Sequence, residues 1–451
     1  MNSLEFIKKA KSGKIDLIKN TKQTIQEIKK INKEYNYFLV IDENPKIPKK
    51  GKLKDKLVSI KDCICVKDME SKSGSKILEG YKPVFDATVV KRIREEGGII
   101  IGKTTQDVFG FGSFNVNTGI GYKPPKNPFD KTRACGGSSG GAAGITQLLD
   151  NHIAISESTG GSIACPACYC GVYGITPTYG RVSRYGLMDY ANSMDKIGVM
   201  SKNIEDMALM LEIISGYDEK DSTSIDKPVE KYTQKSNKKF KIAVIKEFLG
   251  KGVDKEVKNN LINKLKGLKY SKVSLPLTFK FGIPTYYLIS MSEASTNLAK
   301  YCGMRYGKHA ELKGNFNEYF SKVRSKNFSK EAKRRIILGT FARMSGFRDA
   351  FYLKALKVRT KIINEYKKHF KKYDLLITPT MPNIAPKFSE INKMTPLQNY
   401  MMDIMTVGPN LAGLPHLNIP SGFSNKMPTG MLVIADHFQE NKLIQFARSL
   451  L

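Results

Sequence analysis

Two glycine-rich turns, each with a serine inside it, decide how this sequence is interpreted. They read Gly136-Gly137-Ser138-Ser139-Gly140-Gly141 and Thr159-Gly160-Gly161-Ser162-Ile163. Glycine beside a serine permits a tight backbone and the close approach of a substrate. Consecutive N–H groups in such a turn can point into a cavity and hold an oxyanion. The two turns therefore predict a nucleophilic serine with an oxyanion hole beside it.

A serine in such a turn is a poor nucleophile until a base removes its proton. Histidine is the usual base, but the chain has only five histidines, and His416 and His437 have no distinctive setting. A lysine that burial keeps neutral is the alternative. Lys61 fits this role because it ends the apolar run Leu57-Val58-Ser59-Ile60.

A nucleotide-binding motif is matched by letter but not by context. Residues 97–104 satisfy the P-loop pattern. A P-loop needs a flexible loop whose N–H groups wrap a phosphate, whereas the centre of this match is Ile99-Ile100-Ile101. Because β-branched residues prefer extended structure, the segment predicts a buried strand that ends near Gly102.

The first turn also matches the G-x-S-x-G elbow of α/β hydrolases, over residues 136–140. That elbow requires a strand immediately before the serine. The preceding residues 130–134 are polar and lack a strand pattern. A Ser-His-Asp hydrolase is therefore disfavoured.

The cysteines suggest a third kind of site. Cys165-Pro166-Ala167-Cys168 has C-x-x-C spacing, and Cys170 lies close by. A structural zinc site usually takes its four ligands from two such pairs, and the sequence has no second C-x-x-C. We expect small buried thiols here and no metal site.

Composition and charge bound the class of protein. The 451 residues include 74 Lys+Arg and 42 Asp+Glu, a formal charge of +32, and 41% are hydrophobic. Such a chain can bury a sizeable core, which excludes wholesale disorder. The charge suits a polyanion partner such as RNA, DNA or an anionic membrane face, or else a lysine-rich soluble surface.

Cellular location is predicted from what the sequence lacks. It contains no run of 18 apolar residues, so no membrane span is expected. Residues 1–14 have neither a secretory apolar core nor a transit-peptide composition. Seven cysteines, an odd number, favour a reducing compartment. We therefore expect a cytoplasmic protein.

Helical and strand patterns alternate along the chain, which predicts an α/β fold. Helices are expected at 14–33, 87–96, 204–215, from 257, and at 332–372. Strands are expected at 37–42, 57–60, 98–102, 152–155, 241–245, 375–378 and 430–435. Residues 115–144 are expected to form a long loop, and 216–238 a polar surface excursion.

Together these motifs resemble a known family. Ser59-Ile60-Lys61-Asp62, both glycine-rich turns and the block from Cys170 to Leu187 are closely similar to the amidase signature family. Shorter blocks at 292–295, 334–339, 357–359 and 410–415 are similar as well. The resemblance covers nearly the whole chain. It implies one large amidase domain over residues 1–451, with a mixed β-sheet core flanked by helices.

The resemblance implies a Ser–cis-Ser–Lys triad. Ser162 matches the nucleophile, Ser138 the bridging serine on a cis peptide, and Lys61 the base. In this mechanism Lys61 deprotonates Ser138, which in turn activates Ser162 to attack an amide. The oxyanion hole matches Thr159, Gly160 and Gly161.

Substrate contacts are implied in the same way. Arg335 matches an arginine that pairs with the carboxylate of free glutamine. Asp403 matches an acid that holds the ammonium group of glutamine. Tyr286, which has Tyr287 beside it, matches a tyrosine that lines the pocket.

Three positions around the triad depart from the family pattern. Cys63 stands where an asparagine is usual, Ser156-Glu157-Ser158 where Gly-Thr/Ser-Asp is usual, and Ala164 where an arginine is usual. The triad itself is spared. Since neighbouring residues orient a site, we expect these changes to affect rate and pocket specificity.

Within the family the chain is most similar to the glutaminase subunits of tRNA-dependent amidotransferases. This implies hydrolysis of L-glutamine, with the ammonia passed to a B subunit that converts Glu-tRNA(Gln) to Gln-tRNA(Gln), and a small C subunit at their interface. No cofactor is expected in this chain, since ATP and Mg²⁺ would be used by the B subunit. Two alternatives stay open: a stand-alone amidase, and a basic tRNA-binding scaffold with impaired catalysis.

Overall fold

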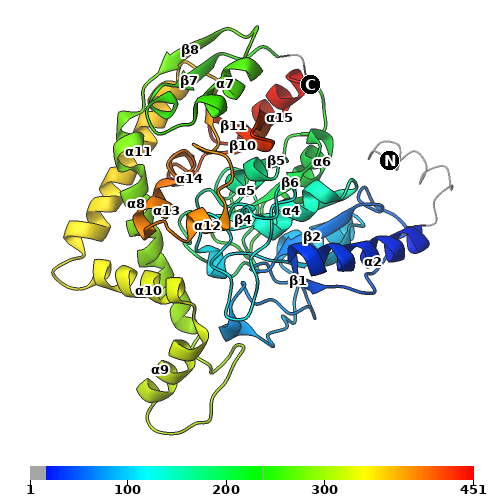
Figure 1. The fold of residues 1–451 in the computed structure, drawn as a ribbon, viewed down its shortest axis with the longest axis vertical. Coiled ribbons are helices and arrows are strands. Elements are labelled where there is room, and N and C mark those ends of the chain that lie inside the picture. The colour runs from blue at the N-terminus through cyan, green and yellow to red at the C-terminus, as the bar shows by residue number, and fades with distance from the viewer. Residues whose placement is uncertain (1–16, 237) are drawn as a thin grey trace.

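The computed structural model of the protein describes residues 17–236 and 238–451. Their strands form one mixed sheet (Figure 1). Over these residues the sheet has eleven strands in the order β1-β3-β2-β4-β6-β5-β10-β11-β9-β7-β8. The strands are β1 Phe38–Ile41, β2 Leu57–Lys61, β3 Ile99–Thr104, β4 His152–Ser158, β5 Tyr173–Thr176, β6 Lys196–Ser201, β7 Ile242–Ile245, β8 Tyr270–Val273, β9 Leu375–Pro379, β10 His416–Ser424 and β11 Met427–Ala435. The predicted α/β class with a mixed sheet is confirmed.

Parallel and antiparallel pairs occupy different parts of the sheet. Strand β2 pairs in parallel with β3 and β4, and β7 pairs in parallel with β8 and β9. The strands between these groups pair antiparallel. Every residue of β2 and β4 is buried, as expected for strands that are covered on both faces.

The register of β2 and β4 positions the site. Ile60 lies beside Ile155, so Lys61 and the residues after Ile155 reach the same edge of the sheet. Parallel strands present their carboxyl ends at one edge, where ligands bind in open α/β sheets. The end of β2 therefore meets the turn that follows β4.

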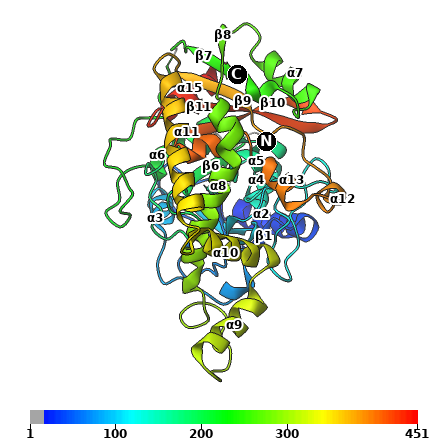
Figure 2. The ribbon, with the colours of Figure 1, turned by 90° about the vertical axis from the view of Figure 1, so that its left-hand side faces the viewer.

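Helices surround the sheet, and α9 projects away from the rest of the fold (Figures 1 and 2). Helix α8 packs against both α10 and α11. The helices are α2 Leu17–Tyr35, α3 Thr88–Glu95, α4 Gly140–Leu148, α5 Ala164–Tyr169, α6 Ile204–Ile214, α7 Lys255–Lys264, α8 Pro276–Asn297, α9 Phe316–Asn327, α10 Lys330–Arg343, α11 Lys354–Phe370, α12 Phe388–Ile391, α13 Pro396–Met401, α14 Val407–Leu411 and α15 Glu440–Ser449. Within the described residues no helix is long and apolar enough to span a membrane.

Most elements expected from the sequence are present. Residues 99–104 of the P-loop match form the buried strand β3 rather than a phosphate-binding loop. The helix expected at 14–33 is α2, described from Leu17, and the prediction for residues 1–14 lies outside the described residues. The prediction of one domain over residues 1–451 stays a prediction.

Two predicted boundaries are wrong. The loop expected to continue to residue 144 ends at Gly140, where α4 begins, because the small residues there pack in the core as a helix. The helical stretch expected at 332–372 is interrupted after Arg343, where Met344 has an extended backbone. Gly346 has a left-handed φ of +82° and turns the chain before α11.

Candidate active site

Lys61 and Ser138 lie in direct contact at the edge of the sheet. Lys61 is the last residue of β2 and has no exposed surface. Its Nζ donates a hydrogen bond of 2.7 Å to Ser138 Oγ. The Gly137–Ser138 peptide is cis, the geometry that the resemblance implies for the bridging serine. The predicted base and the predicted bridging serine therefore lie in hydrogen-bond contact, and their catalytic roles stay a prediction.

Asp107 holds the loop that carries Ser138. Its backbone N–H donates to the Ser138 carbonyl, and its carboxylate accepts from the N–H groups of Asn115 and Asn117. A Cβ on Gly137 would lie 2.2 Å from Asp107 Oδ2, so only glycine fits there. Burial raises the pKa of Asp107 to about 6. The glycines of the first turn thus serve close packing beside the site.

The first glycine-rich turn packs against the helix that follows the second turn. A Cβ on Gly136 would lie 2.9 Å from Cα of Pro166, in the helix that follows the second turn. Ser162 is 5% exposed and stands just before α5. In the described part of the chain no hydrogen bond joins Ser162 Oγ to Ser138 or Lys61. The structure therefore brings Lys61 and Ser138 into contact and leaves the Ser162 hydroxyl unengaged.

The second turn has donors available for an oxyanion. The backbone N–H groups of Gly160, Gly161 and Ser162 have no acceptor among the described residues. The side chain before the turn, Ser158, donates to the Gly160 carbonyl at 2.8 Å and fixes the backbone. Thr159 lies at the start of this turn, and its hydroxyl contacts two acidic side chains. Unpaired N–H groups beside a serine are what an oxyanion hole requires.

Asp403 and the tyrosine pair pack against this turn. A Cβ on Gly160 would lie 2.9 Å from the Tyr286 ring, and one on Gly161 would lie 3.4 Å from Asp403 Oδ1. Asp403 Oδ2 accepts from Tyr287 Oη at 2.6 Å and from a serine, Ser113, at 2.9 Å. Asp403 Oδ1 has no donor in the described residues, so it is available to a cationic ligand.

Arg335 lies in an aromatic enclosure next to Asp403. Its guanidinium stands over the rings of four aromatic residues, Phe111, Tyr190, Tyr287 and Tyr400. Nε donates to Glu331 at 2.9 Å and Nη1 to Tyr190 Oη at 2.6 Å. Nη2 has no acceptor within the described part of the chain. One edge of Arg335 is therefore free for a carboxylate.

A cavity of about 480 Å³ opens beside these side chains. Its wall includes Asp107, Ser113, Arg335 and Tyr400. Asp107, whose N–H bonds the Ser138 carbonyl, and Ser113, which donates to Asp403, both line the cavity, so it lies next to residues that contact Ser138 and Asp403. A small zwitterion fits the charges at this place.

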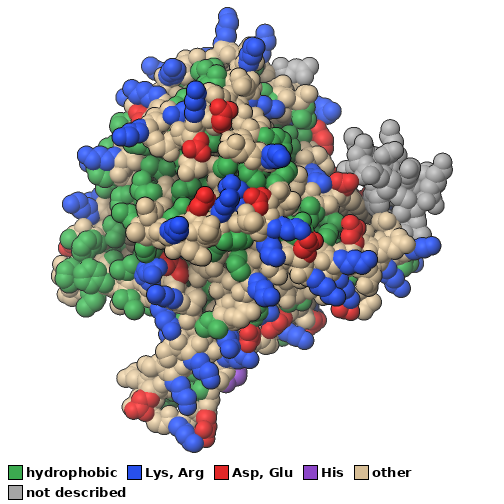
Figure 3. All heavy atoms as spheres, in the orientation of Figure 1, with side chains coloured by type: hydrophobic (Ala, Val, Ile, Leu, Met, Phe, Trp, Pro, Cys, Tyr) green, Lys and Arg blue, Asp and Glu red, His purple; other side chains and the backbone are tan. Residues whose placement is uncertain are grey.

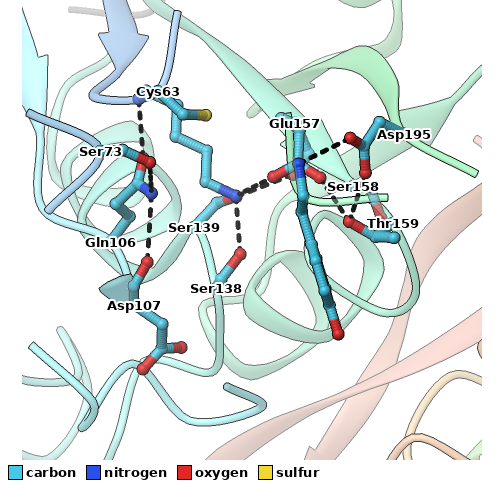
Figure 4. Close-up of polar contacts among 12 residues, drawn as sticks. Cys63, Ser73, Gln106, Asp107, Ser138, Ser139, Glu157, Ser158, Thr159 and Asp195 are labelled. Atoms are coloured by element: carbon cyan, nitrogen blue, oxygen red, sulfur yellow. Dashed lines mark hydrogen bonds and ion pairs between the residues drawn. The ribbon is translucent and has the colours of Figure 1, made fainter. Parts of the chain in front are cut away.

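One functional side chain is missing from the predicted set. Glu157, in β4, departs from the family pattern, and its Oε2 lies 2.8 Å from Lys61 Nζ. Figure 4 shows the side chains of Ser138 and Glu157 directed toward the nitrogen that both contact, Lys61 Nζ, with Thr159 and Asp195 beyond Glu157. A charged residue that is almost fully buried is rare unless it is paired, but sequence alone does not reveal the partner.

The cysteines behave as core residues. Six of the seven are buried, and all seven are free thiols. Cys165 Sγ donates to the Ser113 carbonyl at 3.3 Å, and burial raises the pKa of Cys63 beside Lys61. The prediction of small buried thiols is confirmed.

The fold and this site define an amidase, and the chain belongs to that family: the family model described as Amidase matches residues 20–444. Two similar proteins have a name more specific than that of the family. The A subunit of glutamyl-tRNA(Gln) amidotransferase from Sulfurihydrogenibium sp. is 44% identical over 398 residues, which cover 86% of this chain and 81% of the relative. The protein of the same name from Persephonella marina is 42% identical over 447 residues, covering 97% of this chain and 89% of the relative.

Solved structures agree with the family. The crystal structure of the glutamyl-tRNA(Gln) amidotransferase A subunit from Thermotoga maritima matches with a TM-score of 0.81 at 37% identity, covering 95% of this chain and 90% of that chain. A 6-aminohexanoate cyclic dimer hydrolase matches with a TM-score of 0.82 at 20% identity, covering 100% of this chain and 96% of that chain. The second likeness shows the fold alone.

Proposed function

We propose that the chain is the glutamine-hydrolysing subunit of a tRNA-dependent amidotransferase. The observation that carries this proposal is the buried Lys61–Ser138 contact beside a turn whose N–H groups are free. The free edges of Arg335 and Asp403 support an amino-acid substrate rather than a simple amide, because together they complement a carboxylate and an ammonium group. The names of the relatives support the same assignment.

The chemistry follows from the groups in place. Lys61, in its neutral form, takes the proton of Ser138, and Ser138 takes that of Ser162 as Ser162 Oγ attacks the side-chain amide carbon of glutamine. The N–H groups of the second turn stabilise the tetrahedral oxyanion. The proton returns to the leaving nitrogen, ammonia departs, and a glutamyl ester remains on Ser162. Water then attacks the ester and releases glutamate.

The ammonia is used elsewhere in the assembly. We place the activation of Glu-tRNA(Gln), with its need for ATP and Mg²⁺, in a partner B subunit, and a small C subunit at the contact between the two. The many Lys and Arg side chains, which are scattered over the face in Figure 3, suit a complex that carries tRNA. On the face that Figure 3 shows, they do not gather into one strip that would mark a tRNA path.

An exposed apolar face offers a place for a partner subunit. Around the end of α10 and the turn after it, six large hydrophobic side chains are from 36% to 67% exposed: Ile337, Leu338, Phe341, Met344, Phe347 and Phe351. Figure 3 shows apolar side chains gathered at the left, where this turn lies in Figure 1. Contiguous exposed apolar side chains usually mark an interaction surface.

Replacing Phe341 and Phe347 together by aspartate is expected to remove the partner subunits from the purified complex. The centroids of the two rings lie 4.4 Å apart, and burying a charge in their place opposes docking. The measurement is co-purification, followed by ammonia release from glutamine with and without partners. Phe423→Asp, at an exposed site in β10, is the control and should keep the partners. Unchanged partner binding, or loss of self-association only, would contradict the assignment of this face.

Arg335→Ala is expected to raise the KM for glutamine by roughly 10- to 100-fold, because hydrogen bonds to charged groups contribute about 1.5–3 kcal/mol. Steady-state ammonia release measures it. Arg343→Ala, on the same helix but bonded to Ser295, is the matched control. An unchanged KM in the Arg335 variant would remove this residue from the pocket.

A further inference from the structure

The contacts of Glu157 are the feature of the site that the triad chemistry does not use. Glu157 is 3% exposed in a strand whose other residues are buried as well. Its Oε2 lies 2.8 Å from Lys61 Nζ, and its backbone carbonyl accepts from the same Nζ at 2.9 Å. With the bond to Ser138, these contacts occupy three directions around the lysine nitrogen. The direction in which Lys61 points is therefore set by Glu157.

The other oxygen of Glu157 begins a chain of hydrogen bonds. Oε1 lies 2.7 Å from Thr159 Oγ1, which lies 2.8 Å from Asp195 Oδ1. A hydroxyl has a single proton and can donate to only one of two acceptors. Two carboxylates on one hydroxyl therefore require a proton on one of them. The hydrogen-bond chain of Glu157, Thr159 and Asp195 must hold that proton for both contacts of the hydroxyl to be hydrogen bonds.

Asp195 closes this hydrogen-bond chain. Burial raises the pKa of Asp195 well above its usual range, and the nearby Glu157 carboxylate raises it further. Three hydrogen bonds from the backbone N–H groups of Tyr190 and Ala191 fix the Asp195 carboxyl group in place. Glu157 therefore contacts Lys61 through Oε2 and is held through Oε1 by the Thr159 hydroxyl, which Asp195 fixes in turn.

We propose that Glu157 is a positioning residue for the triad: it aims Lys61 at Ser138, while Thr159 and Asp195 lock Glu157 in place. This inference rests on the proposed function. Because proton transfer requires the lysine nitrogen to lie against Ser138 Oγ, loss of the Glu157 contacts should lower kcat and leave KM nearly unchanged.

Other ionisable groups also interact with Lys61 and with the hydrogen-bond chain beside it. Asp107 and the Cys63 thiol interact electrostatically with Lys61. Arg184 interacts with Asp195 from the far side. These groups remain in every variant below, so a difference between the wild-type protein and a Glu157 variant reports on Glu157.

The test is glutamine hydrolysis by the assembled complex, with kcat and KM measured separately for Glu157→Gln and Glu157→Asp. Glu157→Gln keeps the shape of the side chain and removes the carboxylate that contacts Lys61. Glu157→Asp keeps the carboxylate and shortens its reach. We expect kcat to fall about tenfold in both variants, with KM within twofold of wild type.

Two outcomes would overturn the inference: full kcat in either variant, or a KM that rises by as much as kcat falls. If Glu157→Gln fails to fold, Glu157→Asp decides alone, by the same kcat criterion. Glu95→Gln, at an exposed site on α3, is the control and should match wild type throughout. Ser162→Ala in the same assay separates the two proposals, since turnover without Ser162 would refute the proposed function whatever Glu157 does.

Discussion

Replacing Ser162 by alanine is expected to lower glutamine hydrolysis by at least about 10⁴-fold, the scale on which enzymes lose turnover when a nucleophilic serine is removed. Ser162 is small and 5% exposed, and no described hydrogen bond depends on its hydroxyl, so the fold should not change. Ammonia release by the assembled complex is the measurement. Thermal unfolding of the same preparation shows whether the variant is intact.

The Ser162 variant has a built-in control. Ammonium chloride, supplied in place of glutamine, should still support amidation of Glu-tRNA(Gln) by the assembled complex, because it bypasses this subunit. Ser139→Ala, in the other glycine-rich turn, tests whether another serine can serve. Within the described residues its hydroxyl has one hydrogen bond, to the Glu157 carbonyl at 3.4 Å. Normal glutamine use by the Ser162 variant would show that the nucleophile is misassigned.

Lys61→Met should be as inactive as Ser162→Ala and, unlike it, strongly destabilised. Methionine fills the space of the lysine stem but leaves the Glu157 carboxylate buried without its partner. Breaking a buried ion pair by removing one member costs about 3–5 kcal/mol. Denaturant unfolding measures this change. Lys91→Met, at an exposed helical site, should leave stability and activity near wild type.

A double variant separates the two roles of Lys61. Lys61→Met combined with Glu157→Gln removes the unpaired charge, so we expect much of the lost stability to return while glutamine hydrolysis stays absent. If the double variant is no more stable than Lys61→Met, the ion pair does not explain the destabilisation. If it regains activity, Lys61 is not the base.

The fold near the site is predictable from local pattern. Strand β2 follows from a continuous apolar run, and β3 from three consecutive isoleucines, which overrule the P-loop match. Helix α8 escapes prediction because it contains Pro284 and is buried on several sides, so its sequence shows little amphipathic period. The break between α10 and α11 depends on a single left-handed glycine, Gly346, within an otherwise helical pattern.

The site is predictable in part, for a different reason. Lys61, Ser138 and Ser162 stand in motifs whose residue order carries the signal, and the structure places Lys61 on Ser138. Glu157 cannot be found in this way. The pattern ends the predicted strand at residue 155, whereas β4 runs on to Ser158 and carries Glu157 to the lysine. That pairing depends on the register between β2 and β4, which no local pattern encodes.

The central claim is that Ser162 is the nucleophile of an amidase that cleaves the side-chain amide bond of glutamine. Mass spectrometry of the acid-quenched complex after brief incubation with glutamine tests it most directly. The account predicts a glutamyl ester on the peptide that contains Ser162, and its absence in the Ser162→Ala and Lys61→Met variants. An ester on Ser138 or Ser139 in the wild-type protein, or an undiminished ester in either variant, would contradict it.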